Sequence, residues 1–163
     1  MLNFNLHLPT QIFFGQGKID ELGKEILKYG NKVLLVYGGG SIKRNGLYGQ
    51  IQQIFKDNNI SCFELSGVQA NPRIDSVREG VNLCRQYQVD LVLAAGGGSS
   101  IDCAKTIAAG ALYEGDAWDF FSRRARVTDA LPIAAILTLA ATGSEMNSFA
   151  VISNPETGQK SGT

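Results

Sequence analysis

The chain has 163 residues, of which 44% are hydrophobic and 18% charged, as is typical of a globular protein with one core. Fifteen basic and fifteen acidic residues cancel, so no net charge attracts nucleic acid or an anionic membrane, and we expect neither as a partner. The N-terminus lacks the pattern of a secretory signal, and no apolar run reaches the ~20 residues of a membrane span, so we expect a cytoplasmic protein.

The hydrophobic pattern predicts strands alternating with helices along the chain. Alternating residues at Asn3–Leu8 and a short run at Gln11–Gly15 predict an N-terminal strand pair. Beyond it, continuous apolar runs predict buried strands at Lys32–Tyr37, Leu91–Ala95 and Leu131–Leu139. Further short strands are expected at Ser61–Leu65 and Ala150–Ser153. Helical spacing predicts helices at Lys18–Tyr29, Gly46–Asn58, Arg73–Gln88, Ile101–Ala111 and Asp116–Phe121. We therefore predict an α/β fold, a single domain over residues 1–163 with a mainly parallel sheet flanked by helices.

Two of the predicted buried strands run directly into the same Gly-Gly-Gly-Ser turn, at Gly38–Ser41 and at Gly96–Ser99. Glycine lets a ligand approach the backbone closely, and the helix start that follows attracts phosphate. Neither turn is G-x-G-x-x-G, because Lys43 and Ile101 stand where the third glycine would fall. Two such turns on one sheet edge indicate a dinucleotide ligand, and tight strand-to-helix connections without a ligand are the alternative.

The first of these turns lacks the Asp or Glu that usually holds the ribose 2′-OH of NAD. Ser41 can donate a hydrogen bond there, and Lys43 and Arg44 add positive charge close by. Such a turn accepts a 2′-phosphate without repulsion, so we predict NADP(H) over NAD(H) as the cofactor. For Lys43 and Arg44, a solvated pair at a helix end is the alternative.

Several polar side chains follow the second turn. Asp102 and Lys105 share one helix face, either as a surface ion pair or with Asp102 directed at a substrate or ribose hydroxyl. Four polar residues lie at and just after the end of a predicted strand, and they either bind a ribose or diphosphate or cap a helix: Thr138, Thr142, Ser144 and Glu145. The only histidine, His7, is predicted to be a surface residue, and the three cysteines to be buried thiols. We therefore predict no metal site in this chain.

These motifs resemble the N-terminal domain of the iron-containing (group III) alcohol dehydrogenases, most closely the butanol dehydrogenase branch. The resemblance covers essentially the whole chain through the segments NFNLHLPTQIFFGQGKIDELG, VYGGGSIKRNGLY, GVQANPRIDSVREG, LAAGGGSSIDCAK and LTLAATGSEMNSFAVISN. It implies a Rossmann-like fold similar to the N-terminal domain of dehydroquinate synthases. It also implies hydride transfer between NADP(H) and an alcohol or aldehyde.

The resemblance also implies a cofactor contact for individual residues of this chain. The implied contacts are Gly97, Gly98 and Ser99 for the pyrophosphate; Gly39, Gly40 and Ser41 for the adenosine 2′-phosphate; Asn71 for the adenosine; Thr138 and Thr142 for the ribose and diphosphate; and Asp102 and Lys160 for the nicotinamide side.

Members of the family continue into a helical domain that supplies an Asp and three His to the iron, and this sequence ends at Thr163 before them. We therefore expect the cofactor half of a longer enzyme, inactive alone, with iron only in the complete enzyme. A homodimer is compatible with these observations. The alternatives are a stand-alone nucleotide-binding module without catalysis and a piece of a zinc enzyme of the glycerol dehydrogenase type.

Overall fold

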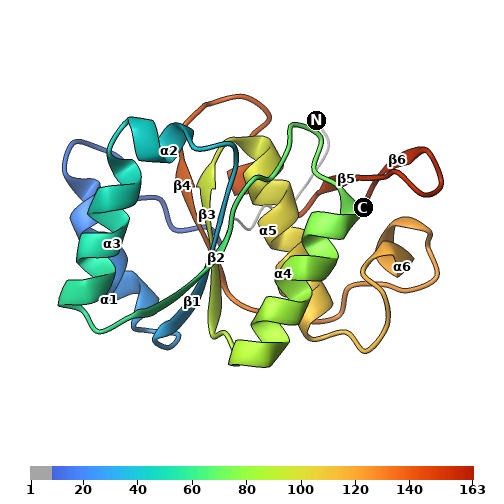
Figure 1. The fold of residues 1–163 in the computed structure, drawn as a ribbon, viewed down its shortest axis with the longest axis horizontal. Coiled ribbons are helices and arrows are strands. Elements are labelled where there is room, and N and C mark those ends of the chain that lie inside the picture. Colours follow the sequence, from blue (N-terminus) through green and yellow to red (C-terminus); the bar gives the residue numbers. More distant parts are fainter. Residues whose placement is uncertain (1–8) are drawn as a thin grey trace, which may run out of the picture.

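The computed structural model describes residues 9–163, and its centre is a parallel four-stranded sheet in the order β2-β1-β3-β4 (Figure 1). The strands are β1 (Lys32–Tyr37), β2 (Ser61–Leu65), β3 (Leu91–Gly96) and β4 (Ile133–Leu137). Val33 of β1 lies opposite both Cys62 of β2 and Leu91 of β3, which places β1 and β3 at the centre. These two central strands are the ones with continuous apolar runs, and their side chains are buried on both faces.

Helices cover both faces of the sheet (Figure 1). One face carries α1 (Leu22–Ile26), which continues the 3₁₀ turn η1 (Lys18–Glu21), and α3 (Leu47–Asp57). The other face carries α4 (Ile74–Tyr87) and α5 (Gly98–Ala111). The remaining elements are α2 (Ser41–Arg44), α6 (Trp118–Phe121), η2 (Ser144–Met146) and an antiparallel hairpin of β5 (Val151–Asn154) and β6 (Gln159–Gly162).

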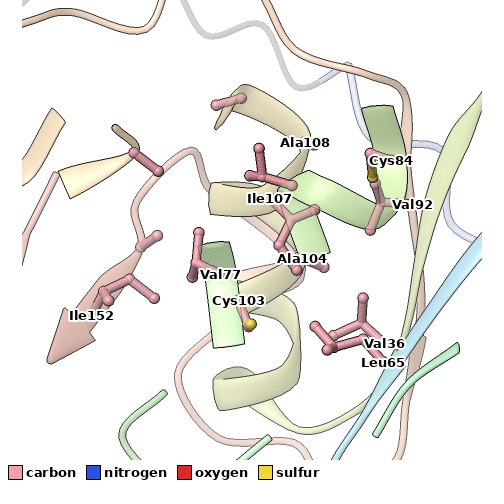
Figure 2. Packing of buried hydrophobic residues seen from close by; sticks show 14 of the residues in the cluster. Val36, Leu65, Val77, Cys84, Val92, Cys103, Ala104, Ile107, Ala108 and Ile152 are labelled. Atoms are coloured by element: carbon pink, nitrogen blue, oxygen red, sulfur yellow. The ribbon is translucent and has the colours of Figure 1, made fainter. Parts of the chain in front are cut away.

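The apolar core is divided by the sheet into two clusters of buried side chains. In the cluster between α1, α3 and the sheet, Ile51 and Phe55 are the fully buried residues of α3. Figure 2 shows the cluster on the other face, where Val77 of α4 lies near Cys103 and Ile107 of α5. This packing fixes the direction of α5, the helix that follows the second glycine turn.

Most of the predicted elements are confirmed, and the structure differs from the prediction at β4, α5, β6 and the N-terminus. The run Leu131–Leu139 was expected to be a buried strand, yet β4 is shorter and lies at the sheet edge, with Ile133 41% and Leu137 38% exposed. An apolar run does not reveal whether a neighbouring strand covers its outer side. Helix α5 begins at Gly98 rather than Ile101, so the second turn is part of the helix start. Strand β6 is polar and exposed, and the apolar pattern does not predict it.

The predicted N-terminal strand pair is not seen as such. Gln11–Gly15 is irregular and exposed, so the strand predicted there is wrong. Its predicted partner, Asn3–Leu8, lies outside the described residues, as does His7. The antiparallel pair that the structure does contain is the β5-β6 hairpin.

The three cysteines are free thiols, and the predicted burial is confirmed for Cys84 and Cys103, whereas Cys62 is only half-buried. Burial raises the pKa of the Cys84 and Cys103 thiols to about 12, which keeps both protonated at neutral pH. Among residues 9–163, no helix combines the length and the apolar character that crossing a bilayer requires.

Candidate functional site

The two glycine turns lie side by side at the carboxyl edge of the sheet, because β1 and β3 are hydrogen-bonded neighbours. A Cβ atom placed on Gly38 would lie 4.0 Å from the Ser100 hydroxyl of α5 and 3.2 Å from the Val68 carbonyl oxygen. The predicted arrangement, two turns lining one edge, is therefore present. In doubly wound sheets this edge is where ligands bind.

The second turn leads into the start of α5 without a capping side chain. Gly97 is extended (φ −93°, ψ −169°), and its carbonyl oxygen accepts hydrogen bonds from the Ser100 and Ile101 N–H groups at 3.0 and 3.3 Å. The N–H groups of Gly98 and Ser99, the first two helical residues, lie outside the intrahelical ladder. They are available to an anion, in the positive field of the helix N-terminus.

The threonines predicted to bind the cofactor lie beside this helix start. A Cβ atom on Gly98 would lie 2.7 Å from Thr142 Oγ1, so the Thr142 hydroxyl stands directly over the first residue of α5. The Thr138 N–H donates to the Gly96 carbonyl oxygen at 3.0 Å, which holds the end of β4 against the end of β3. The structure thus brings both threonines to the second glycine turn.

The first turn is open at Gly39, where an added Cβ would meet nothing within 4 Å. Gly40 adopts a left-handed conformation (φ 95°) that a residue with a Cβ rarely takes, and Ser41 follows it as the first residue of α2. The Arg44 Nη1 atom lies 3.8 Å from the position of a Cβ on Gly40. Arg44 is therefore a cation placed beside this turn.

Lys43, predicted to lie near a cofactor phosphate, is placed on two aromatic rings instead. Its Nζ atom is 4.8 Å from the ring centroid of Tyr48 and 5.3 Å from that of Tyr37. Both tyrosine hydroxyls donate to Glu64 of β2 at 2.6 Å. Nothing in the sequence marks Glu64 as a site residue, because its position near Tyr37 follows from the parallel register of the strands, in which Glu64 lies opposite Leu35.

The Tyr48 phenol is expected to titrate at unusually high pH. Its hydrogen bond to Glu64, partial desolvation and the nearby negative charge raise its pKa to about 12. The folded state therefore favours the neutral phenol. The stabilising contribution is complete below pH ~10, the ordinary tyrosine pKa, and is lost as the pH rises from ~10 to ~12. Ultraviolet titration of phenolate absorbance should show Tyr48 ionising earlier in Glu64→Gln. It should be unchanged in Glu79→Gln, an exposed carboxylate of α4.

Asp102, the candidate for the nicotinamide side, is held by protein groups on both carboxylate oxygens. Oδ1 accepts a hydrogen bond from the Ser144 hydroxyl at 2.5 Å, and Oδ2 accepts one from the Val151 N–H at 3.0 Å. The Lys105 ammonium lies 3.6 Å from Oδ1, so the two side chains form an ion pair, although they are only 12% and 17% exposed and the pair is not at the surface as the alternative expected. Asp102 therefore attaches the segment after β4 to α5, and its contact with a cofactor stays a prediction.

Lys105 strengthens the same attachment. Its ammonium donates to the Ser144 carbonyl oxygen at 2.9 Å and also to the carbonyl oxygens of Asn147 and Phe149. Burial lowers the pKa of Lys105, while the charge of Asp102 opposes that shift. The pair holds the Ser144–Phe149 segment close to the helix whose N-terminus faces the glycine turns.

Asn71 and Lys160, predicted to contact opposite ends of the cofactor, are neighbours in the structure. The Lys160 ammonium donates to the Asn71 side-chain oxygen at 2.5 Å. Asn71 has a positive φ of 60°, and the Ser153 N–H donates to the Pro72 carbonyl oxygen at 2.9 Å. The loop before α4 is thus joined to the β5-β6 hairpin, and both predicted contacts lie at this junction.

Two hollows lie away from the glycine turns. One of about 410 Å³ is lined by Phe121 and Lys160, and one of about 740 Å³ by Lys105 and Ile133 together with the loop after α6. Within residues 9–163, no group of three or more His, Cys, Asp or Glu side chains is placed to hold a metal ion. The described residues therefore do not fit an iron site.

Comparison with known proteins identifies the relatives of this chain. Residues 9–163 match the profile of the family described as iron-containing alcohol dehydrogenase. The chain is 60% identical to NADH-dependent butanol dehydrogenase A of Clostridium acetobutylicum, over 99% of this chain and 42% of that protein. It is 41% identical to the NADPH-dependent aldehyde reductase YqhD of Escherichia coli, over 98% of this chain and 41% of that protein.

A solved structure agrees with these sequence relationships. The crystal structure of NADH-dependent butanol dehydrogenase A from Thermotoga maritima matches with a TM-score of 0.96 and 49% identity, over 99% of this chain and 41% of that one. The chain thus spans about two-fifths of the length of its relatives. The agreement in sequence and fold shows that the chain belongs to the iron-containing alcohol dehydrogenase family.

Proposed function

We propose that this chain is the dinucleotide-binding domain of an alcohol dehydrogenase that transfers hydride between NADP(H) and an alcohol or aldehyde. The observation that carries the proposal is the meeting of two glycine turns, Gly38–Ser41 and Gly96–Ser99, on one sheet edge beside the uncapped start of α5. The reaction class is supported by the names of the relatives, which are alcohol dehydrogenases and an aldehyde reductase. Those names do not favour the stand-alone binding module considered as an alternative.

The preference for NADP(H) is the finer part of the proposal. Its support is that the first turn carries no carboxylate among the described residues, and that the Arg44 guanidinium lies beside Gly40. The nearby carboxylate of Glu64 already accepts a hydrogen bond from a tyrosine hydroxyl on each oxygen. The names of the relatives differ: those at 52–60% identity are called NADH-dependent, and YqhD is called NADPH-dependent.

The proposed cofactor contacts lie at the two turns, in the segment after β4, and at the junction of the loop before α4 with the β5-β6 hairpin. They comprise Gly39, Gly40, Ser41 and Lys43 at the first turn; Gly97, Gly98, Ser99 and Asp102 at the second; Thr138 and Thr142 after β4; and Asn71 and Lys160 at the junction. We also propose that the iron ligands lie outside this chain. The cytoplasmic location and a homodimer stay predictions from the sequence.

Calorimetric titration of the chain with NADPH and with NADH tests this function. We expect both nucleotides to bind and NADPH to bind more tightly, by roughly threefold or more, because an exposed charge pair contributes about that much. We expect no butanol oxidation by the chain alone. Tighter binding of NADH would refute the 2′-phosphate argument, and failure to bind either nucleotide would refute the dinucleotide site. Metal-dependent turnover by the chain would show that it does hold catalytic ligands.

A further inference from the structure

Two tyrosine rings next to the first glycine turn bind the ammonium group of Lys43. Tyr37 is the last residue of β1, directly before Gly38, and Tyr48 lies in the first turn of α3. Their rings are 6.0 Å apart at an angle of 57°, and the Lys43 ammonium lies over both of them. Tyr37 and Tyr48 thus form an aromatic cation-binding site.

Glu64, on the neighbouring strand β2, positions the two tyrosines of this cation-binding site. Tyr37 donates to Glu64 Oε2 and Tyr48 to Oε1, each at 2.6 Å, and the Gln52 amide also donates to Oε1 at 3.3 Å. The carboxylate therefore fixes both phenol groups, and its negative charge adds to the attraction that the aromatic faces exert on a cation.

The Lys43 side chain is nevertheless able to move out of this cation-binding site. Its side chain is exposed, and no carboxylate lies within ion-pair distance of its ammonium in the described residues. It lies in α2, two residues after Ser41, and is therefore close in sequence to the first glycine turn. Arg44, the next residue, already lies against Gly40.

We propose that Tyr37, Tyr48 and Glu64 form a resting site for Lys43 that competes with the cofactor's 2′-phosphate and so limits the preference for NADP(H) over NAD(H). The inference rests on the proposed function, because it concerns the same turn. Glu64 acts in it as a positioning residue, through Lys43. A nucleotide with a 2′-phosphate attracts Lys43 out of the resting site, whereas one with a free 2′-OH leaves it there. The free energy that holds Lys43 in the resting site therefore weakens the binding of NADP(H) but not that of NAD(H).

A double-mutant cycle on Glu64 and Lys43 tests this competition. The variants are Glu64→Gln, Lys43→Met and the two combined, each titrated calorimetrically with NADPH and with NADH. In Glu64→Gln we expect NADPH to bind about two- to fivefold more tightly, the range that corresponds to an exposed cation–aromatic contact, and NADH affinity to be unchanged. In the Lys43→Met background the same substitution should have no effect on NADPH.

The cycle separates this mechanism from simpler effects of the carboxylate. A gain for NADPH that persists without Lys43 would mean that Glu64 merely repels the phosphate, and would overturn the proposal. Equal changes for NADPH and NADH would indicate a purely structural role and would also overturn it. If the wild-type chain binds neither nucleotide, the proposed function fails and this inference fails with it.

A second variant tests the resting site without altering the carboxylate. Tyr48→Leu removes one of the two rings, and we expect it to strengthen NADPH binding but not NADH binding. Tyr48→Phe keeps the ring and removes only the hydroxyl, so it should give a smaller gain. Equal NADPH affinity in Tyr48→Leu and the wild type, with the fold intact by circular dichroism, would overturn the proposal.

Discussion

Replacing Gly80 with alanine should lower the free energy of unfolding by about 1–3 kcal/mol, although alanine normally stabilises a helix. Gly80 is a buried residue of α4, and an added Cβ would lie 2.4 Å from Cδ1 and 2.8 Å from Cγ1 of Ile107 in α5. Leu65 of β2 is also close, at 3.1 Å. Since Ile107 is itself fully buried, the added methyl group has no space to enter without moving one helix.

Gly49 provides the matched control for this prediction. It lies in α3, on the other face of the sheet, and an added Cβ there would meet nothing within 4 Å. Gly49→Ala should therefore stabilise the chain by about 0.5–1 kcal/mol, the usual difference between the two residues in a helix. Urea unfolding followed by circular dichroism measures both changes. Equal gains in both variants would mean that α4 and α5 are farther apart than the structure shows.

A compensating substitution locates the strain of Gly80→Ala. Ile107→Val removes Cδ1, the atom nearest to the new methyl group, at its own cost of about 0.5–1.5 kcal/mol. The double variant should lose less stability than the sum of the two single losses. Strict additivity would show that the clash is relieved elsewhere in the core.

The central part of the fold could be predicted because its signals are local. β1 and β2 have the predicted bounds, since each apolar run ends at a glycine, an asparagine or a serine that does not continue a strand. β4 was misjudged because its apolar run resembles those of β1 and β3, although β4 has one strand neighbour and they have two. The position of a strand within a sheet is set by tertiary pairing, and an apolar run does not contain that information.

In the candidate site, the backbone was easier to predict from the sequence than the side-chain contacts. The glycine turns and the presence of a helix after the second one could be predicted, because glycine, strand and helix patterns fix the backbone over a few residues, although α5 begins three residues earlier than expected. The side-chain partners could not: Asp102 is bound by Ser144, 42 positions away, and Lys160 by Asn71, 89 positions away. Such contacts depend on how separate segments pack.

Replacing Gly98 with valine should weaken NADPH binding at least tenfold, which corresponds to about 1.4 kcal/mol. Gly98 offers one of the two free N–H groups at the start of α5, and its lack of a side chain lets a phosphate approach them. Its backbone is helical, so valine does not strain the main chain there. The new side chain would also meet the Thr142 hydroxyl, which lies 2.7 Å from the Cβ position.

Two further variants decide which of these contacts matters. Gly49→Val makes the same change at an exposed helical glycine of α3 that belongs to neither turn, and it should leave NADPH affinity unchanged. Combining Gly98→Val with Thr142→Ala removes the clash with the threonine while keeping the obstruction at the helix start. If affinity stays low in this combination, the valine blocks the phosphate itself; if affinity recovers, displacement of Thr142 caused the loss. Equal NADPH affinity in the wild type and Gly98→Val would mean that the start of α5 does not hold the phosphates, and the dinucleotide would have to bind elsewhere on the sheet edge.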